Sequence, residues 1–156
     1  GDLVILMAYA FLPTIGTSFV TTGAIDWSVL LIALPVGLIT DGILHSNNTR
    51  DTLTDRRAGI KTMAMGLGHK ASAILYGFEV IFPYVWIGVL SIIGLMPITT
   101  IVIFLTLAVA IGCAKTMMHS LEGGSGVIAD LDVRTANLQL MFSALLTVAF
   151  IVAKFI

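Results

Sequence analysis

A short polar segment between two long apolar stretches holds residue types that could bind a charged, phosphorylated ligand. Residues 45–62 carry Asn, Asp, Arg and Lys side chains at close spacing. If a helix continues through this segment, Asn47, Asp51 and Asp55 lie at positions i, i+4 and i+8 and form one polar stripe. Carboxylates four residues apart repel each other weakly on an exposed helix, and a divalent cation between them would reverse the sign of that interaction. The spacing therefore indicates a candidate cation site.

The basic residues beside this stripe fit a phosphate bound to the cation. Magnesium in proteins combines carboxylate ligands with substrate phosphates and water. Arg50, Arg57 and Lys61 could meet the remaining phosphate charge, the arginines through forked contacts and the lysine as a point charge. Gly59 would then let the chain turn. Together these residues predict a site for a magnesium-bound diphosphate whose organic tail lies in a membrane; the alternative is an ordinary solvated connector of mixed charge.

The composition places this segment in a membrane protein. Of 156 residues, 58% are hydrophobic and 11% are charged, and the mean hydropathy is +1.05. A soluble domain usually has about a quarter of charged residues, so these values exclude a disordered chain, a nucleic-acid-binding module and an ordinary soluble enzyme. The formal net charge is −1. Cys113 is the one cysteine, which excludes an intrachain disulfide and a cysteine-based zinc cluster.

Five apolar stretches are each near the roughly 20 residues that a helix needs to cross a bilayer core. They are continuous and do not alternate, which favours an all-α, polytopic membrane helix bundle in which residues 1–156 form a single transmembrane domain. Prolines are common in membrane helices, so we expect Pro13, Pro35 and Pro83 to kink spans rather than end them. The expected spans are residues 3–25, 27–46, 71–93, 98–114 and 136–153.

The positions of lysine and arginine predict how the chain sits in the membrane. Five basic residues lie between the second and third expected spans, and Lys115 and Arg134 lie between the fourth and fifth. Lys154 alone falls on the other side. We therefore expect residues 45–70, the aspartate-rich motif segment, to lie on the cytoplasmic face, with Trp27 as an interfacial anchor on the opposite face.

The polar segment also resembles a known family motif. Residues 47–62, with the pattern NNTRDxxxDRxAGxKT, resemble the second aspartate-rich motif of the UbiA-type intramembrane prenyltransferases. The NNxRD form and the following TMAxxLG at 62–68 are similar to the menaquinone branch of that family. Further similarity lies in His45-Ser46 before the motif, in Gly1-Asp2-Leu3 and Leu34-Pro35, and in RTANLQL at 134–140.

This resemblance implies a fold of nine helical spans around a central cavity, of which the five spans here match the last five. Two aspartate-rich motifs would hold magnesium ions on a polyprenyl diphosphate. Its ionisation would give an allylic cation that alkylates an aromatic acceptor, most closely 1,4-dihydroxy-2-naphthoate in menaquinone biosynthesis. The implied roles are catalytic magnesium ligands for Asp51 and Asp55, substrate binding in the same site for Asn47 and Asn48, and diphosphate contacts for Arg50 and Lys61.

The first aspartate-rich motif of the family has no counterpart in the sequence. Before Asn47 the acidic residues are Asp2, Asp26 and Asp41, and none has the required pattern. We therefore expect the C-terminal part of a larger enzyme, inactive alone, whose partners are the missing N-terminal helices, the two substrates and the lipid bilayer, with no nucleic acid. Acceptors of sister branches, namely 4-hydroxybenzoate, chlorophyllide and glycerol phosphate, remain alternatives.

Three further ionisable residues lie within or beside the expected spans. An acid at the centre of a membrane helix costs roughly 2.5–3.5 kcal/mol on insertion scales, so Asp41 and Glu79 should face a wet cavity or a partner. Asp41 could instead be hydrated near the headgroups, and Glu79 could reach the surface from a lipid-facing position. His45 could accept a proton from the acceptor ring or be a neutral interfacial histidine. Two alternative functions are a transporter in which Asp41 and Glu79 line a pathway and a non-catalytic membrane scaffold.

Other features are open to a functional and a structural interpretation. Aromatic residues of the third span could line a prenyl tunnel or stabilise a carbocation, but they could also be ordinary helix packing. The glycine-rich residues 121–126 could form a lid or a plain connector, and they lack a nucleotide-binding pattern. Lys115 and Arg134 could reach the diphosphate or contact headgroups. The aromatic residues are Tyr76, Phe78, Phe82, Tyr84 and Trp86.

Overall fold

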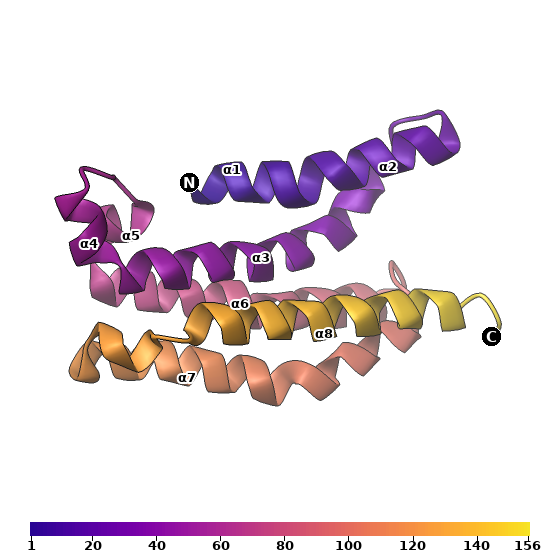
Figure 1. Ribbon diagram of the computed structural model, residues 1–156. Coiled ribbons are helices and arrows are strands. Elements are labelled where there is room, and N and C mark those ends of the chain that lie inside the picture. Colours follow the sequence, from indigo (N-terminus) through magenta and orange to yellow (C-terminus); the bar gives the residue numbers. More distant parts are fainter.

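The chain folds into long helical rods that lie side by side (Figure 1). The computed structural model describes residues 1–156 apart from the side chain of Asp2, so that residue's part in the expected similarity lies outside the described residues. Within the described part, five helices are long and apolar enough to cross a membrane, which confirms the polytopic helix bundle. These candidate spans are Leu3–Thr22, Trp27–Arg50, His69–Ile92, Ile98–Gly123 and Ser125–Val152.

Each rod is built from one or more helical elements. The first rod contains α1 (Asp2–Leu6), the π-helical η1 (Met7–Phe11) and α2 (Leu12–Thr22); the second contains the short η2 (Trp27–Val29) and α3 (Leu30–Arg50). Two short helices follow, α4 (Thr52–Arg57) and α5 (Met63–Leu67). The remaining elements are α6 (His69–Ile92), η3 (Ile98–Thr106) with α7 (Leu107–Gly123), and η4 (Ser125–Ile128) with α8 (Leu131–Val152).

The helices extend further at their polar ends than the apolar stretches do. α3 continues to Arg50 instead of residue 46, α7 continues to Gly123 instead of residue 114, and α8 begins at Leu131 instead of residue 136. Charged side chains end an apolar run, but lysine, arginine and glutamate are good helix formers and do not end a helix. Hydropathy therefore located the spans correctly and placed these three ends wrongly.

Two of the prolines lie inside helices and do not end them, as expected. Pro35 lies inside α3 and Pro83 inside α6. Proline has no backbone N–H, so Pro35 cannot donate to the carbonyl of Leu31 one turn earlier. The indole Nε1 of Trp86, on α6, donates to that carbonyl at 2.9 Å instead. A neighbouring helix thus satisfies a backbone group for which no water is available in a bilayer.

The first rod approaches α3 closely at one glycine. A Cβ on Gly37 would lie 2.6 Å from both the Cβ of Ala10 and the Cδ1 of Leu6. The absent side chain therefore allows α1 and η1 to lie against α3. Pro13, just after η1, cannot donate to the carbonyl of Tyr9, and the wider π-helical turn lies where that bond is missing.

The buried core lies among α3, α6, α7 and α8, while the first rod is largely exposed. Hydroxyl pairs join helices within this core. The Tyr76 hydroxyl and Thr135 Oγ1 lie 2.6 Å apart, and the Tyr84 hydroxyl and Thr106 Oγ1 lie 2.7 Å apart. Such interhelical hydrogen bonds, with close packing, hold membrane helices together where lipid is as apolar as the side chains.

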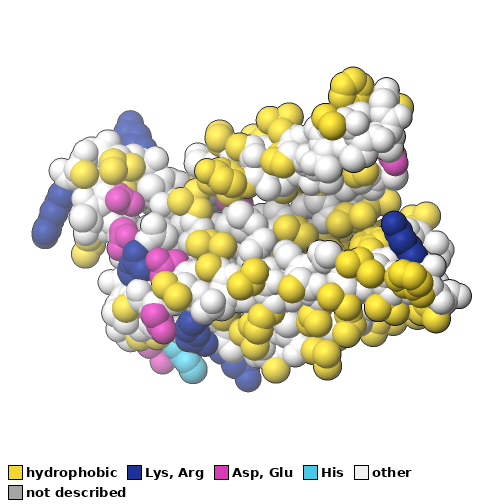
Figure 2. All heavy atoms as spheres, turned by 45° about the vertical axis from the view of Figure 1, so that its right-hand side comes forward, with side chains coloured by type: hydrophobic (Ala, Val, Ile, Leu, Met, Phe, Trp, Pro, Cys, Tyr) yellow, Lys and Arg dark blue, Asp and Glu magenta, His cyan; other side chains and the backbone are white. Residues whose placement is uncertain are grey.

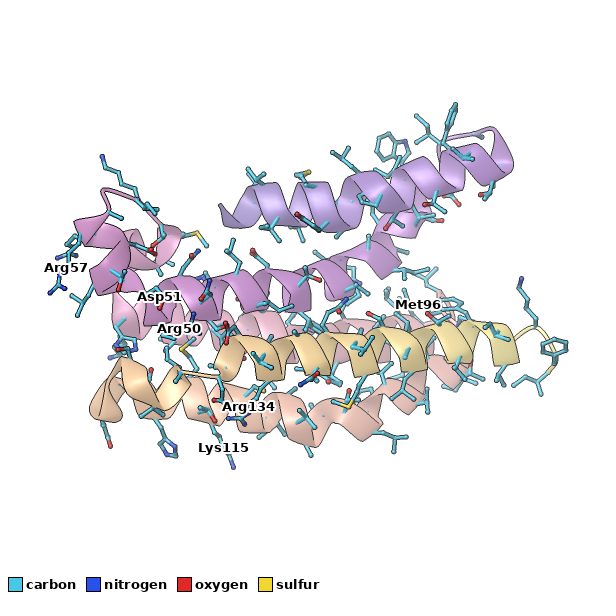
Figure 3. All side chains as sticks on the ribbon, in the orientation of Figure 1. Arg50, Asp51, Arg57, Met96, Lys115 and Arg134 are labelled. Atoms are coloured by element: carbon cyan, nitrogen blue, oxygen red, sulfur yellow. The ribbon has the colours of Figure 1, made fainter. Side chains whose placement is uncertain are left out.

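One end of the bundle carries most of the charge. α4, α5 and the connection between α7 and α8 lie together at the left of Figure 1, opposite the C-terminus. Arg50, Arg57, Lys115 and Arg134 all lie toward this end (Figure 3). In the space-filling view, basic and acidic side chains gather there and hydrophobic side chains cover most of the remaining surface (Figure 2). This distribution is that of an integral membrane protein.

Candidate functional site

The polar stripe predicted from spacing is present in the backbone. The N–H of Asp51 donates to the carbonyl of Asn47 at 2.9 Å, and the N–H of Asp55 donates to the carbonyl of Asp51 at 2.9 Å. Helical hydrogen bonds thus continue through Asp51, although this residue separates α3 from α4. The three residues lie one turn apart on one side of the chain. The turn expected at Gly59 follows, with a φ of 72°.

Arg50 ties the end of α3 to the start of α8. Its Nε donates to Asp51 Oδ1 at 2.9 Å, and its Nη1 donates to Asp132 Oδ2 and to the carbonyl of Ala129, each at 3.0 Å. Its Nη2 donates to Asn47 Oδ1. The hydrogen bond from Arg50, reinforced by its charge, holds the pKa of the Asp51 carboxyl below its usual value, so Asp51 is ionised at neutral pH.

This arrangement places a positive group among the oxygens expected to bind a cation. Arg50 was expected to contact diphosphate, and its guanidinium here contacts Asn47, Asp51 and Asp132 within the chain. The guanidinium therefore already supplies positive charge next to Asn47 and Asp51, and a metal ion bound there would share these oxygens with Arg50. Sequence reasoning missed Asp132, because the residue lies 82 positions from its partner and belongs to no local pattern.

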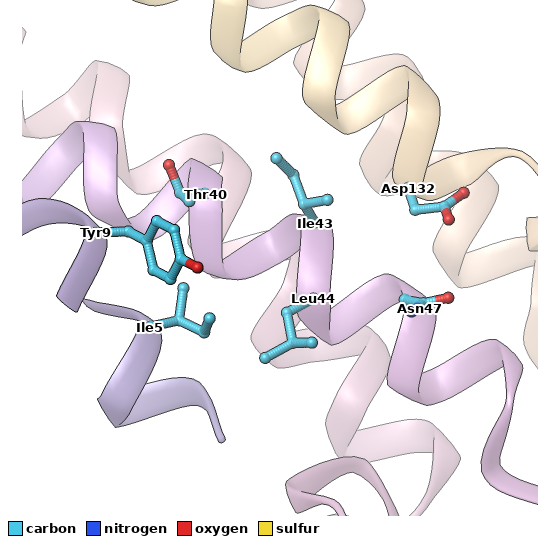
Figure 4. Close-up of a pocket in the computed structure, with 7 residues that line it drawn as sticks. All are labelled: Ile5, Tyr9, Thr40, Ile43, Leu44, Asn47 and Asp132. Carbon is cyan, nitrogen blue, oxygen red and sulfur yellow. The ribbon is translucent and has the colours of Figure 1, made fainter. Parts of the chain in front are cut away.

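A mostly apolar cleft leads away from this polar region (Figure 4). It has a volume of about 250 Å³ and lies between α1–η1 and α3. Asn47 and Asp132 form its polar end, while aliphatic side chains, the ring of Tyr9 and Thr40 line the rest. Such a cleft suits a ligand with a charged head and an apolar tail. The complete lining is Ile5, Tyr9, Thr40, Ile43, Leu44, Asn47 and Asp132.

The other predicted site residues lie around this region with different exposure. Asn48 is partly buried on α3, about 100° around the helix from Asn47, and is not among the residues that line the cleft. Lys61 lies exposed on the connection between α4 and α5. Arg134 donates from Nη1 to Thr116 Oγ1 at 3.1 Å, and Lys115 lines a separate depression beside α6 and α7. The structure therefore brings Asn47, Arg50 and Asp51 together and leaves the lysines apart.

The available donor atoms fit a metal ion that is held partly by protein side chains and partly by a bound phosphate compound. Among the residues that the structure describes, no group of three or more His, Cys, Asp and Glu side chains is placed to hold a metal ion. Asp51, Asp55 and Asn47 offer carboxylate and amide oxygens, the donors that magnesium combines with phosphate oxygens and water. This set does not fit a closed metal site made of protein ligands alone.

The three other ionisable residues are buried between helices. Asp41 is 7% exposed and Glu79 is 2% exposed, and the Nε2 of His45 lies 3.2 Å from the carbonyl of Ser72. A Cβ on Gly42 would lie 3.6 Å from Glu79 Oε2, which places that carboxyl against α3. The hydrated position for Asp41 and the lipid-facing position for Glu79 are therefore wrong, and His45 is packed between helices near the polar end of α3.

The aromatic residues of α6 serve packing. Tyr76 and Tyr84 are fully buried in the core, and Phe78 is 47% exposed on the outer surface. Phe82 stacks on Phe78 with ring centroids 4.7 Å apart. None of the aromatic residues of α6 lines the cleft that contains Asn47, where Tyr9 from the first rod lies instead. Tyr9 carries no sequence signal that would have separated it from other residues of an apolar span.

These features define a polytopic membrane protein with an asparagine–aspartate stripe at the mouth of an apolar cleft. The UbiA prenyltransferase family matches residues 1–126, and the chain belongs to that family.

Similar proteins carry the description UbiA prenyltransferase domain-containing protein 1. The homolog from Drosophila melanogaster is 45% identical over 84 residues, which are 54% of this chain and 23% of that protein. The Xenopus tropicalis protein is 43% identical over 91 residues, 58% of this chain and 26% of that protein. The Homo sapiens protein is 40% identical over 91 residues, 58% of this chain and 27% of that protein. The matched part thus spans about a quarter of these relatives.

Proposed function

We propose that this protein takes part in magnesium-dependent transfer of a prenyl group from a polyprenyl diphosphate to an aromatic acceptor. The observation that carries the proposal is the stripe of Asn47, Asp51 and Asp55 beside the polar end of an apolar cleft. This arrangement matches the two parts of the donor, since the diphosphate needs a cation and oxygen ligands while the prenyl chain needs an apolar channel. Membership of the UbiA prenyltransferase family supports the same chemistry.

The residues of the site would divide the binding of the donor between them. Asp51 and Asp55 would hold magnesium, with Asn47 and Asn48 as neighbouring polar groups, and magnesium supplies positive charge that makes diphosphate a better leaving group. Arg50 already lies beside Asp51 and would direct N–H groups to the diphosphate. Lys61 lies on the α4–α5 connection. It would add a positive point charge when this connection closes over the site.

The cleft would hold and shield the prenyl chain. Ile5, Ile43 and Leu44 give it an apolar lining, which binds a hydrocarbon chain and excludes water from the reacting carbon. The ring of Tyr9 lies in the same cleft. Its π-face is suited to stabilise positive charge that develops on the allylic carbon when the bond to diphosphate breaks.

For the acceptor we propose 1,4-dihydroxy-2-naphthoate, and hence a role in menaquinone biosynthesis. The NNxRD form of the motif supports this choice by resemblance to the menaquinone branch. The concentration of lysine and arginine at the end that holds the site supports a cytoplasmic position for the site. The sequence carries one aspartate-rich motif, so we propose that turnover needs further helices with a second one and that this chain alone binds donor without transferring it.

Binding of a non-hydrolysable prenyl thiodiphosphate to the purified chain tests the proposal. We expect binding that requires magnesium and falls on the order of 10- to 100-fold in Asp51→Ala and in Asp55→Ala, as for the loss of groups that support a metal. Glu122→Gln is the matched control, because Glu122 is an exposed carboxylate at the same end of the bundle. Binding by this variant should equal that of the native chain.

Three results would contradict the assignment. Equal binding with magnesium and with EDTA would show that the site needs no metal. Unchanged binding in both aspartate variants would show that the donor binds elsewhere on the chain. Loss of binding in Glu122→Gln as well would indicate general electrostatic attraction, not a site. A transporter or a scaffold gives no reason for magnesium-dependent binding of this analogue.

A further inference from the structure

A second cavity lies on the other side of the α3–α4 junction. It has a volume of about 350 Å³ and is formed by the end of α3, by α4 and α5, by the start of α6 and by the α7–α8 connection. Thr49 and Thr52 line it, and Thr49 is roughly 200° around the helix from Asp51. The cavity therefore faces away from the stripe of Asn47, Asp51 and Asp55. Its lining consists of Thr49, Arg50, Thr52, Leu53, Arg56, Ala64, Met65, Gly68, His69, Gly124 and Ser125.

The lining of this cavity has basic groups and no acidic ones. Arg50, Arg56 and His69 contribute the basic groups. The charge of Arg50 is matched by Asp51 and Asp132, with which it forms ion pairs. Within the described part of the chain, Arg56 forms no ion pair, so its positive charge is uncompensated at the mouth of the cavity. An anion is the ligand that this charge favours.

Polar groups from three other elements converge on the same cavity. Gly68 lies between α5 and α6, and Gly124 lies between α7 and η4. Their φ values of 78° and 76° allow the sharp turns that bring the backbone of these two connections to the cavity wall. Ser125 offers a hydroxyl from the start of η4. The Nε2 of His69 lies 2.7 Å from Ser120 Oγ, which fixes the imidazole at the wall. The glycine-rich residues considered as a lid or connector thus form part of a polar wall.

We propose that this cavity binds a phosphate group, as a monoester or a diester, at the membrane surface and without a metal ion. Arginine forks and serine hydroxyls are donors that proteins use for phosphate, and Arg56 and Ser125 offer them in this cavity. The first turn of α6, a helix of 24 residues, adds partial positive charge on the same side.

The phosphate can come from a lipid headgroup or from solution. Leu53, in the cavity lining, is 69% exposed, and Ile60 and Leu67 on the same α4–α5 segment are 52% and 43% exposed. Exposed apolar side chains interleaved with arginine and lysine are typical of a segment that lies in the headgroup region. This neighbourhood brings lipid phosphates to the mouth of the cavity.

Two binding measurements on the purified chain, both in EDTA, test the proposal. One titrates inorganic phosphate against the chain in detergent; the other measures retention of phosphatidic acid by the chain from phosphatidylcholine nanodiscs. We expect Arg56→Gln to lower affinity about tenfold, which corresponds to about 1.4 kcal/mol. Arg57→Gln is the matched control: Arg57 is the next residue, is exposed and points away from the bundle (Figure 3). It should leave affinity within about twofold of the native value.

The outcomes separate the sources of phosphate and the possible failures. Retention of phosphatidic acid alone supports a headgroup site, and binding in both measurements supports a site that also takes free phosphate. Equal losses in Arg56→Gln and Arg57→Gln would overturn the proposal in favour of general surface attraction, as would the absence of binding in both measurements. His69→Gln, which should also weaken binding, provides a second variant, and helix content by circular dichroism checks that each variant is folded. Asp51→Ala should retain this binding, so the proposal can fail or succeed separately from the prenyl transfer site.

Discussion

Arg50 is the residue at which the two ends of the polar region meet. It contacts Asp51 beside it and Asp132 on α8, and it touches the side chain of Asn47 one turn earlier. One guanidinium thus fixes the positions of three oxygen-bearing side chains. Because these contacts are charge-assisted hydrogen bonds, they are stronger than those between neutral groups.

The lowered pKa of Asp51 makes the stability of this junction depend on pH. A carboxyl whose pKa is lower in the folded state stabilises the fold above its unfolded value, near 3.8, and loses that contribution as pH falls through the lowered folded value. We therefore expect the thermal unfolding midpoint in detergent to be insensitive to this group near neutral pH and to fall below about pH 4. Asp51→Asn should show a smaller decrease on the acid side.

Glu122→Gln provides the comparison for this titration, since Glu122 is exposed and forms no ion pair within the described residues. Its acid-side decrease should match that of the native chain. The same decrease in Asp51→Asn would show that the Arg50–Asp51 pair does not contribute to the acid response.

At this scale the sequence predicted what is local and missed what is distant. The common face of Asn47, Asp51 and Asp55 follows from helical spacing, and the backbone confirms it. Asp132 and Tyr9 reach the same region from α8 and from η1, through packing that no local spacing encodes. The guanidinium of Arg50 points toward the carboxylates of Asp51 and Asp132, and this direction likewise depends on where α8 begins.

At the scale of elements, Pro35 and Trp86 form a compensating pair. Pro35 removes the N–H that would bond the carbonyl of Leu31, and the indole of Trp86 replaces it from α6. The replacement links two spans at the point where one of them lacks a backbone hydrogen bond. A bond of this kind fixes the relative position of α3 and α6 as well as satisfying a polar group.

Removing the indole donor should therefore destabilise the bundle unless the proline is also removed. Trp86→Phe leaves the Leu31 carbonyl without its donor, at an expected cost of about 1–3 kcal/mol. Pro35→Ala restores a backbone N–H, so the double variant should recover part of this loss. Thermal unfolding of the two single variants and the double variant measures the coupling between the two positions.

Trp27→Phe is the control for loss of an indole, because Trp27 is 64% exposed in η2, at the start of the second rod. It should change stability by less than Trp86→Phe. A double variant no more stable than the sum of its single variants would contradict the compensation.

The elements also show where hydropathy reaches its limit. Apolar stretches located all five spans, yet three ends were wrong, because helix formation continues into the polar interface. The positions of Asp41 and Glu79 could not be decided from the sequence, since both are buried in the bundle and Glu79 lies against α3. Burial in this case depends on which helices become neighbours.

For the whole molecule, the uneven charge predicts the orientation in the membrane. The α4–α5 connection, which carries Lys61, and the end of α7, which carries Glu122, lie at one end, and Lys154 follows α8 at the other. We expect a membrane-impermeant maleimide to label Lys61→Cys and Glu122→Cys from the cytoplasmic side and Lys154→Cys from the opposite side. The native Cys113 is fully buried, so it should remain unlabelled.

Labelling in intact cells, compared with labelling after permeabilisation, measures this orientation. The native chain provides the background, and all three variants carry the new thiol at an exposed position. Labelling of Lys61→Cys and Lys154→Cys from the same side would contradict the five-span topology. If all three variants are labelled from the side opposite to the expected one, the five-span topology holds and the orientation in the membrane is reversed.

The π-helical turn η1 has a consequence for insertions and deletions. A π-helical turn accommodates one residue more than an α-helical turn, within otherwise regular helix. Loss of one residue from Met7–Phe11 could therefore be absorbed by a return to α-helix, with Leu3 and Phe19 still facing their present directions. Loss of one residue within α2 would instead rotate everything beyond it by about 100°. Length changes in the first span should therefore be tolerated best at the turn that also supplies Tyr9 to the cleft.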